Sequence, residues 1–516
     1  MLGTLLSRVL GLVREQLAAG RFGTGDEIAA FTIADNVGTL VYDLMVSGAL
    51  QAALIPVLAG IAVTAAVERA ELRRVAGTLL SVAVLGVGGL AALGVVFAPA
   101  VVWAMTALAG EGEARGAETT DLAITLVRWI LPGVVLLGAG TVLMAVLHAV
   151  GRPAAPALAL AARNAAVVVA ILLLSGALGV RSMAVGTVIG AAAIVALQLP
   201  PLLRAGVLPR PAWQIRHPAV AEVGRLYMPV FLGLLVSATA TVIDRNLAWG
   251  AGEDALGAMR YATTLVQMVL GLVAAAISLA VLPTLARFAA AGDEAAFRAT
   301  LARALAMTAV LILPATLGLA AIGRPTVALL FQHGATGEDE GRQIAIALFG
   351  YLPGALAAAF DQVLIFAFYA RRDTRTPVLV GVLAVGVYLL VALPLVRPLG
   401  MLGLVLANSA QWIAHALVMW WLARRRFGGV GDAALVRTTR RAGLAAIATG
   451  AAALLCWAAL VEAIPTRDSI GIELLLVVMP AVLGAAIYAG LLARLSVDEF
   501  GALRSAVLSR VRGRSR

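Results

Sequence analysis

Apolar runs long enough to cross a lipid bilayer recur along the whole 516-residue chain, and they restrict its fold more than any other feature. A spanning helix needs about 20 mostly apolar residues, and in lipid every backbone polar group must be paired within the protein. We count fourteen such runs, at 1–20, 28–63, 76–107, 122–148, 156–177, 183–203, 222–249, 256–286, 299–321, 341–370, 376–395, 400–423, 440–461 and 470–493. With 62% hydrophobic residues and a mean hydropathy of +0.98, the sequence predicts an all-α polytopic membrane protein with about 14 transmembrane helices.

The arginines predict how this protein is oriented. If the N-terminus lies inside, the inner loops and tail carry 26 arginines and the outer loops carry 7. Cytoplasmic loops are enriched in basic residues, so both termini are expected in the cytoplasm. We therefore attribute the net charge of +11 to membrane topology, and we expect no nucleic-acid partner.

Two short patterns occur twice. Gly23–Glu27 (GTGDE) resembles Gly250–Asp254 (GAGED), and in both copies a proline follows 33 residues after the first glycine. Residues 149–156 (AVGRPAAP) match residues 370–377 (ARRDTRTP) in spacing and in loop position. Turns with glycine and an acidic residue are common, but the preserved spacing favours a true repeat. Six spans separate the copies, which predicts a parallel repeat, as in several transporters.

The repeat suggests a division of the chain into two six-helix lobes followed by two further helices. The expected segments are an N-lobe at 1–205, a cytoplasmic linker at 206–221, a C-lobe at 222–426, the two extra spans at 427–495 and a basic cytoplasmic tail at 496–516.

The first predicted span carries three charges, Arg8, Arg14 and Glu15. On a helical wheel they share one sector with Ser7 and Gly11, while apolar residues occupy most of the remainder. A charge at membrane depth costs a few kcal/mol unless it faces protein or water. This face therefore predicts a wet cavity for an anionic group, since arginine suits phosphate. An amphipathic helix lying in the membrane interface is the competing interpretation.

Other predicted spans also contain ionisable residues, which are functional candidates by default inside a membrane. The candidates for ion binding or gating are Asp35, Asp244, Arg245 and Asp361. Asp244 and Arg245 could instead hold helices together as a structural pair. The four histidines are scattered, and we interpret them as loop or core residues.

No catalytic or cofactor motif occurs in the sequence. A phosphate-binding loop, an HExxH pattern and metal-spaced histidines are absent, and Cys456 is the single cysteine. We therefore expect a transporter that is not an enzyme and that has no cofactor. The expected driving force is the membrane potential, an ion gradient such as that of a monovalent cation, or the flux of substrate.

Four stretches together resemble the MurJ/MviN family of lipid II flippases, within the superfamily of multidrug and polysaccharide exporters. They are SRVLGLVREQLAAGRFGTG (7–25), YDLMVSGALQAALIPVL (42–58), LFQHGAT (330–336) and FYARRDTRTP (368–377). The resemblance implies a protein of the bacterial plasma membrane that serves cell-wall synthesis and cell shape. Its implied activity is to move undecaprenyl-pyrophosphate-linked peptidoglycan precursor from the inner to the outer leaflet by alternating access. The implied partners are this lipid, membrane lipids and cell-wall synthesis proteins.

The resemblance also implies roles for individual residues. Arg8 and Arg14 match the two arginines of the family's first helix, and Glu15 stands where an acidic residue is usual. Spans thirteen and fourteen would form a groove for the lipid tail. Tyr42 and Asp43 replace a basic pair, and threonines replace an Asp-Arg pair in span eight, one turn from Arg260. Tyr42, Asp43 and Arg260 are therefore candidate substrate contacts, with Arg260 compensating for the lost charges.

Four other functions remain open at this point. The chain could export another polyprenyl-linked glycan, or exchange drugs for cations as other members of the superfamily do. It could also be a membrane enzyme acting on polyprenyl phosphates, or a scaffold for cell-wall assembly.

Overall fold

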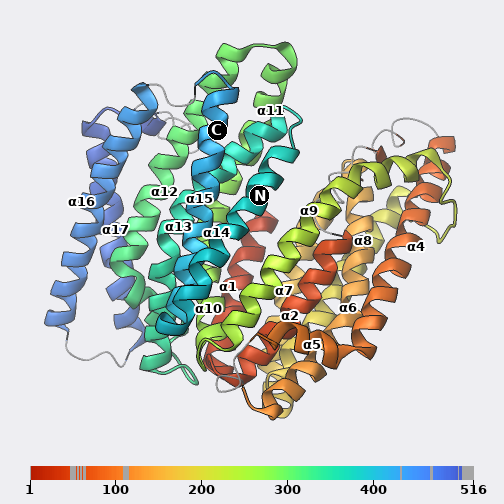
Figure 1. Ribbon diagram of the computed structural model, residues 1–516, viewed down its shortest axis with the longest axis horizontal. Coiled ribbons are helices and arrows are strands. Elements are labelled where there is room, and N and C mark those ends of the chain that lie inside the picture. The colour runs from red at the N-terminus through yellow and green to blue at the C-terminus, as the bar shows by residue number, and fades with distance from the viewer. Residues whose placement is uncertain are drawn as a thin grey trace. The chain divides into compact units, whose positions relative to one another are not determined.

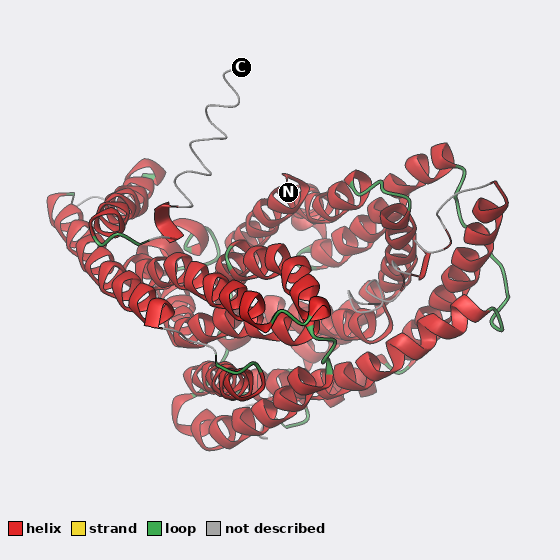
Figure 2. Cartoon of the chain, turned by 90° about the horizontal axis from the view of Figure 1, so that it is seen from above, coloured by secondary structure: helices red, strands yellow, loops and turns green. Residues whose placement is uncertain are grey.

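The computed structural model describes residues 2–46, 54, 57, 58, 61, 66–108, 115–429, 433–464, 469–497 and 499–501. All regular structure in this part of the chain is helical (Figures 1 and 2). The helices are α1 (Leu2–Phe22), α2 (Asp26–Val46), α4 (Ala66–Val96), α5 (Ala98–Thr106), α6 (Ala117–Ala149), α7 (Ala154–Leu178), α8 (Arg181–Ala205), α9 (Pro218–Trp249), α10 (Ala255–Leu272), α11 (Ala274–Ala291), α12 (Glu294–Phe331), α13 (Glu338–Ala370), α14 (Arg375–Leu399), α15 (Met401–Arg426), α16 (Ala433–Ala463) and α17 (Ile470–Arg494).

In the described chain the predicted apolar runs correspond to these helices, with two interruptions; most of residues 47–63 of the second run lie outside the described residues. The third run breaks at Phe97 between α4 and α5, and the eighth breaks at Val273 between α10 and α11. Eleven segments of the described chain are long and apolar enough to cross a membrane. α1, which carries Arg8, Arg14, Glu15 and Arg21, is not among them. The all-α polytopic fold is thus confirmed, while fourteen crossings stay a prediction.

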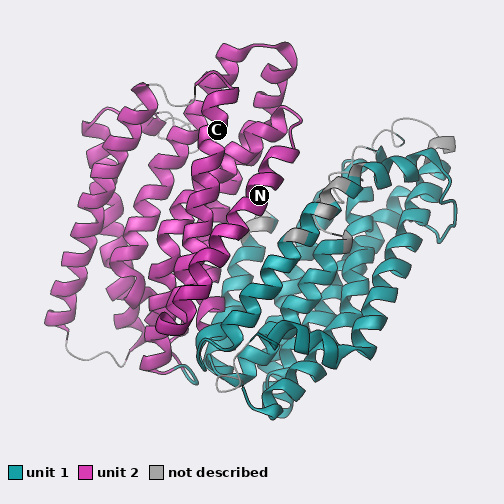
Figure 3. Ribbon diagram, viewed as in Figure 1, with its two compact units in different colours: residues 1–257, 334–336 teal, residues 258–333, 337–516 magenta. Residues whose placement is uncertain are grey.

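The chain forms two compact units (Figure 3). Unit 1 comprises residues 1–257 and 334–336, and unit 2 comprises residues 258–333 and 337–516. Unit 1 therefore includes α9 and the short segment between α12 and α13. The lobe boundaries expected from the repeat stay a prediction.

Small residues allow close helix packing in unit 1. A Cβ atom on Gly190 of α8 would lie 2.8 Å from the backbone oxygen of Arg163 in α7, and one on Gly186 would lie 2.7 Å from the Cα of Val167. The two glycines are four residues apart, so they lie on one face of α8. Their spacing brings the backbone of α7 against α8 and so positions the polar residues of α7.

The two copies of the first repeated pattern contact each other within unit 1. Thr24 donates a hydrogen bond to Asp254 at 2.5 Å. Arg115, before α6, pairs with Asp26 and donates to the backbone oxygens of Gly252 at 3.0 Å and Glu253 at 2.5 Å. This Arg115 side chain is only 5% exposed. The two turns are therefore joined at one end of the unit, as expected for copies with the same orientation.

Unit 2 contains helix pairs and one marked kink. α12 packs on α16, and α13 packs on α15. Phe297, Phe368 and Phe427 form an aromatic cluster, and the guanidinium of Arg371 lies 4.4 Å from the ring centre of Phe297. Within α12, Ile322 leaves helical geometry three residues before Pro325. Proline removes a backbone donor and clashes with the preceding turn, which explains the kink.

Candidate functional site

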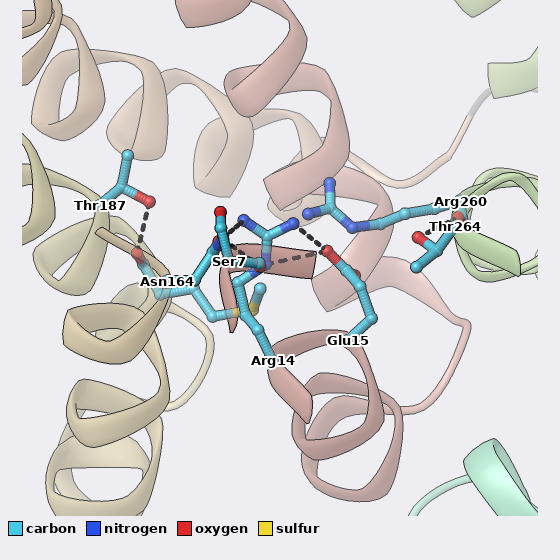
Figure 4. Close-up of polar contacts among 8 residues, drawn as sticks. Ser7, Arg14, Glu15, Asn164, Thr187, Arg260 and Thr264 are labelled. Atoms are coloured by element: carbon cyan, nitrogen blue, oxygen red, sulfur yellow. Dashed lines mark hydrogen bonds and ion pairs between the residues drawn. The ribbon is translucent and has the colours of Figure 1, made fainter. Parts of the chain in front are cut away.

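A network of polar side chains joins α1 to α7 inside unit 1 (Figure 4). Arg14 donates to Oε1 of Glu15 from Nε at 3.0 Å and from Nη2 at 2.5 Å. Its Nη1 donates to Oδ1 of Asn164 at 3.2 Å. The amide nitrogen of Asn164 donates to the backbone oxygen of Ser7 at 2.9 Å and to its hydroxyl at 3.2 Å. We call Ser7, Arg14, Glu15 and Asn164 the α1–α7 cluster.

The α1–α7 cluster orients Arg14 without using all of its donors. A guanidinium has five N–H groups, and the three contacts to Glu15 and Asn164 take three of them. Glu15 is 1% exposed, whereas 23% of the Arg14 side chain remains accessible. A buried carboxylate thus holds an arginine whose outer edge can still donate to another acceptor. Such a preoriented fork suits a phosphate oxygen.

The other predicted residues of unit 1 lie at separate places. Arg8 is half-buried on α1, two turns before Glu15. Tyr42 on α2 has its hydroxyl 3.0 Å from that of Thr141 in α6. Asp43 is half-buried on α2 and interacts electrostatically with Tyr227 of α9. Asp35 is also half-buried on α2. The roles predicted for these residues stay predictions.

Asp244 and Arg245, both on α9, form an ion pair with each other at 3.5 Å. This contact joins neighbours on one helix, so the interpretation that the two residues hold helices together stays a prediction. Arg260 lies on α10 in unit 2, and its backbone oxygen accepts a hydrogen bond from Thr264 at 3.1 Å. The substrate role predicted for Arg260 stays a prediction.

A second buried ionisable pair lies in unit 2. Oδ2 of Asp361 on α13 is 2.7 Å from Nδ1 of His415 on α15. The side chains are 12% and 13% exposed. Nε2 of the same histidine is 3.3 Å from the backbone oxygen of Pro377 at the start of α14. The sequence predicts Asp361 as an ion or gating residue, but His415 was interpreted only as a loop or core residue.

An apolar cavity of about 480 Å³ opens among α10, α12, α16 and α17 in unit 2. The kink residue Ile322, Pro314, Gly318 and Gly484 contribute to its wall. Polar groups are rare there, and the hydroxyl of Tyr488 is already bonded to the backbone oxygen of Val310 at 2.7 Å. We call this cavity the α12–α17 groove. Its shape and lining suit a hydrocarbon chain.

Sequence reasoning missed several contacts of these sites. Asn164 lies in a predicted span, but nothing in the sequence marks it as the partner of Arg14. Thr141 gave no signal, because a lone threonine in an apolar helix usually bonds its own backbone, and this one does so at Leu137. In the described residues, no three His, Cys, Asp or Glu side chains gather to hold a metal ion.

A polytopic helical fold that holds a partly buried arginine among polar side chains and also contains an apolar cavity defines a class, the multi-pass membrane proteins with sites inside their helical units. Comparison with known families narrows this class. The family model described as "Lipid II flippase MurJ" matches residues 18–467. This chain therefore belongs to the MurJ family of lipid II flippases, and its apolar helices make it a multi-pass protein of the bacterial inner membrane.

Individual relatives agree with this assignment. The chain is 29% identical over 438 residues to the lipid II flippase MurJ of Burkholderia cenocepacia, covering 82% of each protein. It is 29% identical over 392 residues to the probable lipid II flippase MurJ of Vibrio cholerae, covering 74% of this chain and 73% of the relative.

Solved structures show the same fold. A structure of lipid II flippase MurJ in an inward closed conformation matches with a TM-score of 0.79 at 19% identity, covering 96% of this chain and 98% of that one. An inward-facing multidrug transporter of the MATE family matches with a TM-score of 0.68 at 17% identity. This match covers 82% of this chain and 94% of the transporter.

Proposed function

We propose that this protein moves lipid II, the undecaprenyl-pyrophosphate-linked peptidoglycan precursor, from the inner to the outer leaflet for cell-wall synthesis. The observation that carries the proposal is the α1–α7 cluster, in a chain of the MurJ family. The substrate has an anionic pyrophosphate and a long hydrocarbon tail. An arginine with two available N–H groups and an apolar groove supply one partner for each part.

The two arginines of α1 have different tasks in this proposal. Arg14 is held by Glu15 and Asn164, so it is preorganised to donate to one phosphate oxygen. Glu15 offsets its charge, whereas Arg8, two turns earlier on the same helix, adds a further positive charge. We therefore assign the electrostatic attraction of the pyrophosphate to Arg8 and its orientation to Arg14. Tyr42 and Asp43 supply no positive charge at positions that are basic in better-known members, which increases the importance of α1.

The proposed topology follows from the arginine distribution, with both termini in the cytoplasm. Transport would proceed by alternating access without a bound cofactor, driven by the membrane potential or by an ion gradient. The α12–α17 groove would hold the lipid tail, and the α1–α7 cluster would bind the pyrophosphate. This places tail binding on α16 and α17, the last two helices of the described chain.

Complementation tests this function. Cells depleted of their own lipid II flippase should grow when they express this chain, and purified protein in vesicles should expose lipid II on the opposite leaflet. Arg8→Ala should abolish growth at normal expression, whereas Arg204→Ala, in the last turn of α8, should support it. Failure of the well-expressed wild-type chain to complement, together with failure to flip lipid II in vesicles, would refute the proposal.

Two alternatives make different predictions. A cation-coupled drug antiporter would depend on Asp35, Asp43 and Asp361 and would tolerate loss of Arg8 and Arg14. An exporter of another polyprenyl-linked glycan would keep the arginine dependence but would discriminate against lipid II in a competition assay. The family assignment favours lipid II over both.

A further inference from the structure

When Asp361 is ionised, the two contacts of His415 require two N–H groups, and a neutral imidazole has only one. One ring nitrogen is 2.7 Å from a carboxylate oxygen of Asp361, and the other is 3.3 Å from the backbone oxygen of Pro377. Both neighbours are acceptors when the carboxylate is ionised. A neutral imidazole has one N–H group and an imidazolium has two. Two bare acceptor atoms at 2.7 Å would repel each other.

Two protonation states satisfy this geometry, and both contain the same number of protons. Either His415 is an imidazolium beside an ionised Asp361, or a neutral Asp361 donates to a neutral His415 whose other nitrogen donates to Pro377. In both states the pair is electrically neutral. Loss of one proton leaves a net negative charge and a single hydrogen for two contacts. One of the two links, to α13 or to α14, must then be lost.

The residues packed around the Asp361–His415 pair are mostly apolar. The adjoining layer of α11, α12 and α13 is apolar, with Leu285, Leu301 and Val363 in one buried cluster. Within α13, Tyr369 is the titratable side chain that interacts with Asp361. Five of the charged groups at the nearby ends of α11 to α15 have contacts of their own: Arg287 with Phe288, Arg298 with Phe427, Arg303 with Ala299, Arg371 with Glu294, and Arg426 with Asp373.

One further feature points to exchange rather than to a static bridge. Oδ1 of Asp361 and Nδ1 of His415 are both buried without a hydrogen bond in the described part of the chain, so the 2.7 Å contact between Nδ1 and Oδ2 is an ion-pair contact, and Asp361 as a whole is 8% exposed. A purely structural carboxylate at this depth would be expected to have both oxygens satisfied. The unbonded oxygen offers a place for a second proton or a transient water molecule.

We propose that Asp361 and His415 form a proton-binding site that couples transport to the proton gradient. This inference rests on the proposed lipid II function. A proton enters from the outer side, binds to the pair and ties α13 and α14 to α15. It leaves to the cytoplasm when those ties are released, while the lipid moves outward. Only O–H and N–H bonds form and break, so the protein returns to its starting state after each cycle.

Histidine NMR tests the site without any transport. The chain has four histidines, so His415→Gln identifies the His415 signal in the ¹⁵N-histidine spectrum of the purified protein. We expect this signal to shift between about pH 5 and pH 9 as the pair loses its proton, whether the proton leaves the imidazole or the neighbouring carboxyl. We also expect Asp361→Asn to move the midpoint by about one pH unit or more, and Asp373→Asn, on an exposed pair near the end of the same helix, to leave it unchanged. A His415 signal that neither titrates nor shifts across this range, or that ignores Asp361→Asn, overturns the site.

Vesicle transport tests the coupling. With acid on the side of the outer loops, wild-type protein and Asp373→Asn should flip lipid II about fivefold faster or more than without a gradient. Asp361→Asn and His415→Gln should still flip lipid II, but at a rate that the gradient does not change. Equal gradient responses in all four proteins overturn the coupling. A wild-type protein that flips no lipid II refutes the proposed function, and the NMR result then decides the proton site alone.

Discussion

The α1–α7 cluster and the α12–α17 groove are built in opposite ways. The cluster places charged and amide groups inside a membrane protein, and each has a partner at hydrogen-bonding distance. The groove removes nearly all polar groups from its wall and leaves open space. The first depends on directional contacts and the second on volume. Mutations in the cluster should therefore impair orientation and stability, whereas mutations in the groove should impair binding of the lipid tail.

The largest expected effect is the loss of Glu15. Glu15→Ala leaves Arg14 partly buried beside Asn164 alone, which should cost about 3 kcal/mol of stability. Transport should be abolished, because Arg14 is then no longer oriented. Thermal unfolding in detergent and complementation measure the two effects. Glu27→Gln, on an exposed residue of the same unit, is the matched control and should behave as wild type.

A double variant distinguishes orientation from stability. Arg14→Met combined with Glu15→Met removes both charges and should recover most of the lost stability, since a buried ion pair adds little over apolar packing. Transport should stay absent. A stable double variant that still flips lipid II would contradict the role given to Arg14.

The next largest effect should come from filling the groove. A Cβ atom added to Gly318 of α12 has no neighbour within 4 Å, so Gly318→Leu fills open space without backbone strain. We expect flipping of lipid II to fall about tenfold, which is a loss of about 1.4 kcal/mol in transport free energy. Stability should be unchanged or slightly higher, because leucine is a better helix former.

The tail length of the substrate gives the control for this result. A lipid II analogue with a short tail should be flipped equally by wild type and by Gly318→Leu. Gly386→Leu, on α14 outside the groove, also has open space around its Cβ and should transport both substrates normally. Equal losses for long and short tails would mean that the groove does not bind the tail.

The sequence predicted the fold better than it predicted the partners within the sites. Hydropathy locates helices because burial in lipid acts on every residue of a run. It did not locate the breaks at Phe97 and Val273, which divide runs that are apolar throughout. Arg14 and Glu15 stood out because charges are rare in spans. Asn164 and His415 acquire their roles from helices about 150 and 50 residues away in sequence, and that proximity exists only in the folded chain.

A smaller effect is expected at Asn164. Asn164→Ala removes an acceptor of Arg14 and both contacts to Ser7, while the pairing of Arg14 with Glu15 remains. The loss of stability should be about 1–2 kcal/mol, and transport should fall only a few-fold. Asn164→Asp should keep the acceptor for Arg14 and retain more activity than Asn164→Ala. If the alanine variant is as inactive as Glu15→Ala, the amide and not the carboxylate orients Arg14.

The smallest expected effect lies at Asp373, outside the membrane-spanning segments. Partial burial raises the pKa of its carboxyl, but hydrogen bonds from Thr376 and the charge of Arg426 outweigh this and hold the pKa below its usual value. Because the folded pKa is the lower one, its stabilising contribution is present above about pH 4 and is lost as the pH falls through the folded value. The pair is partly exposed, so Asp373→Asn should cost at most about 1 kcal/mol at pH 7. The unfolding temperatures of the two proteins should differ at neutral pH and converge in acid. A difference that grows in acid would contradict this sign. Any loss of transport in Asp373→Asn would show that Asp373 takes part in transport and does not only stabilise the fold.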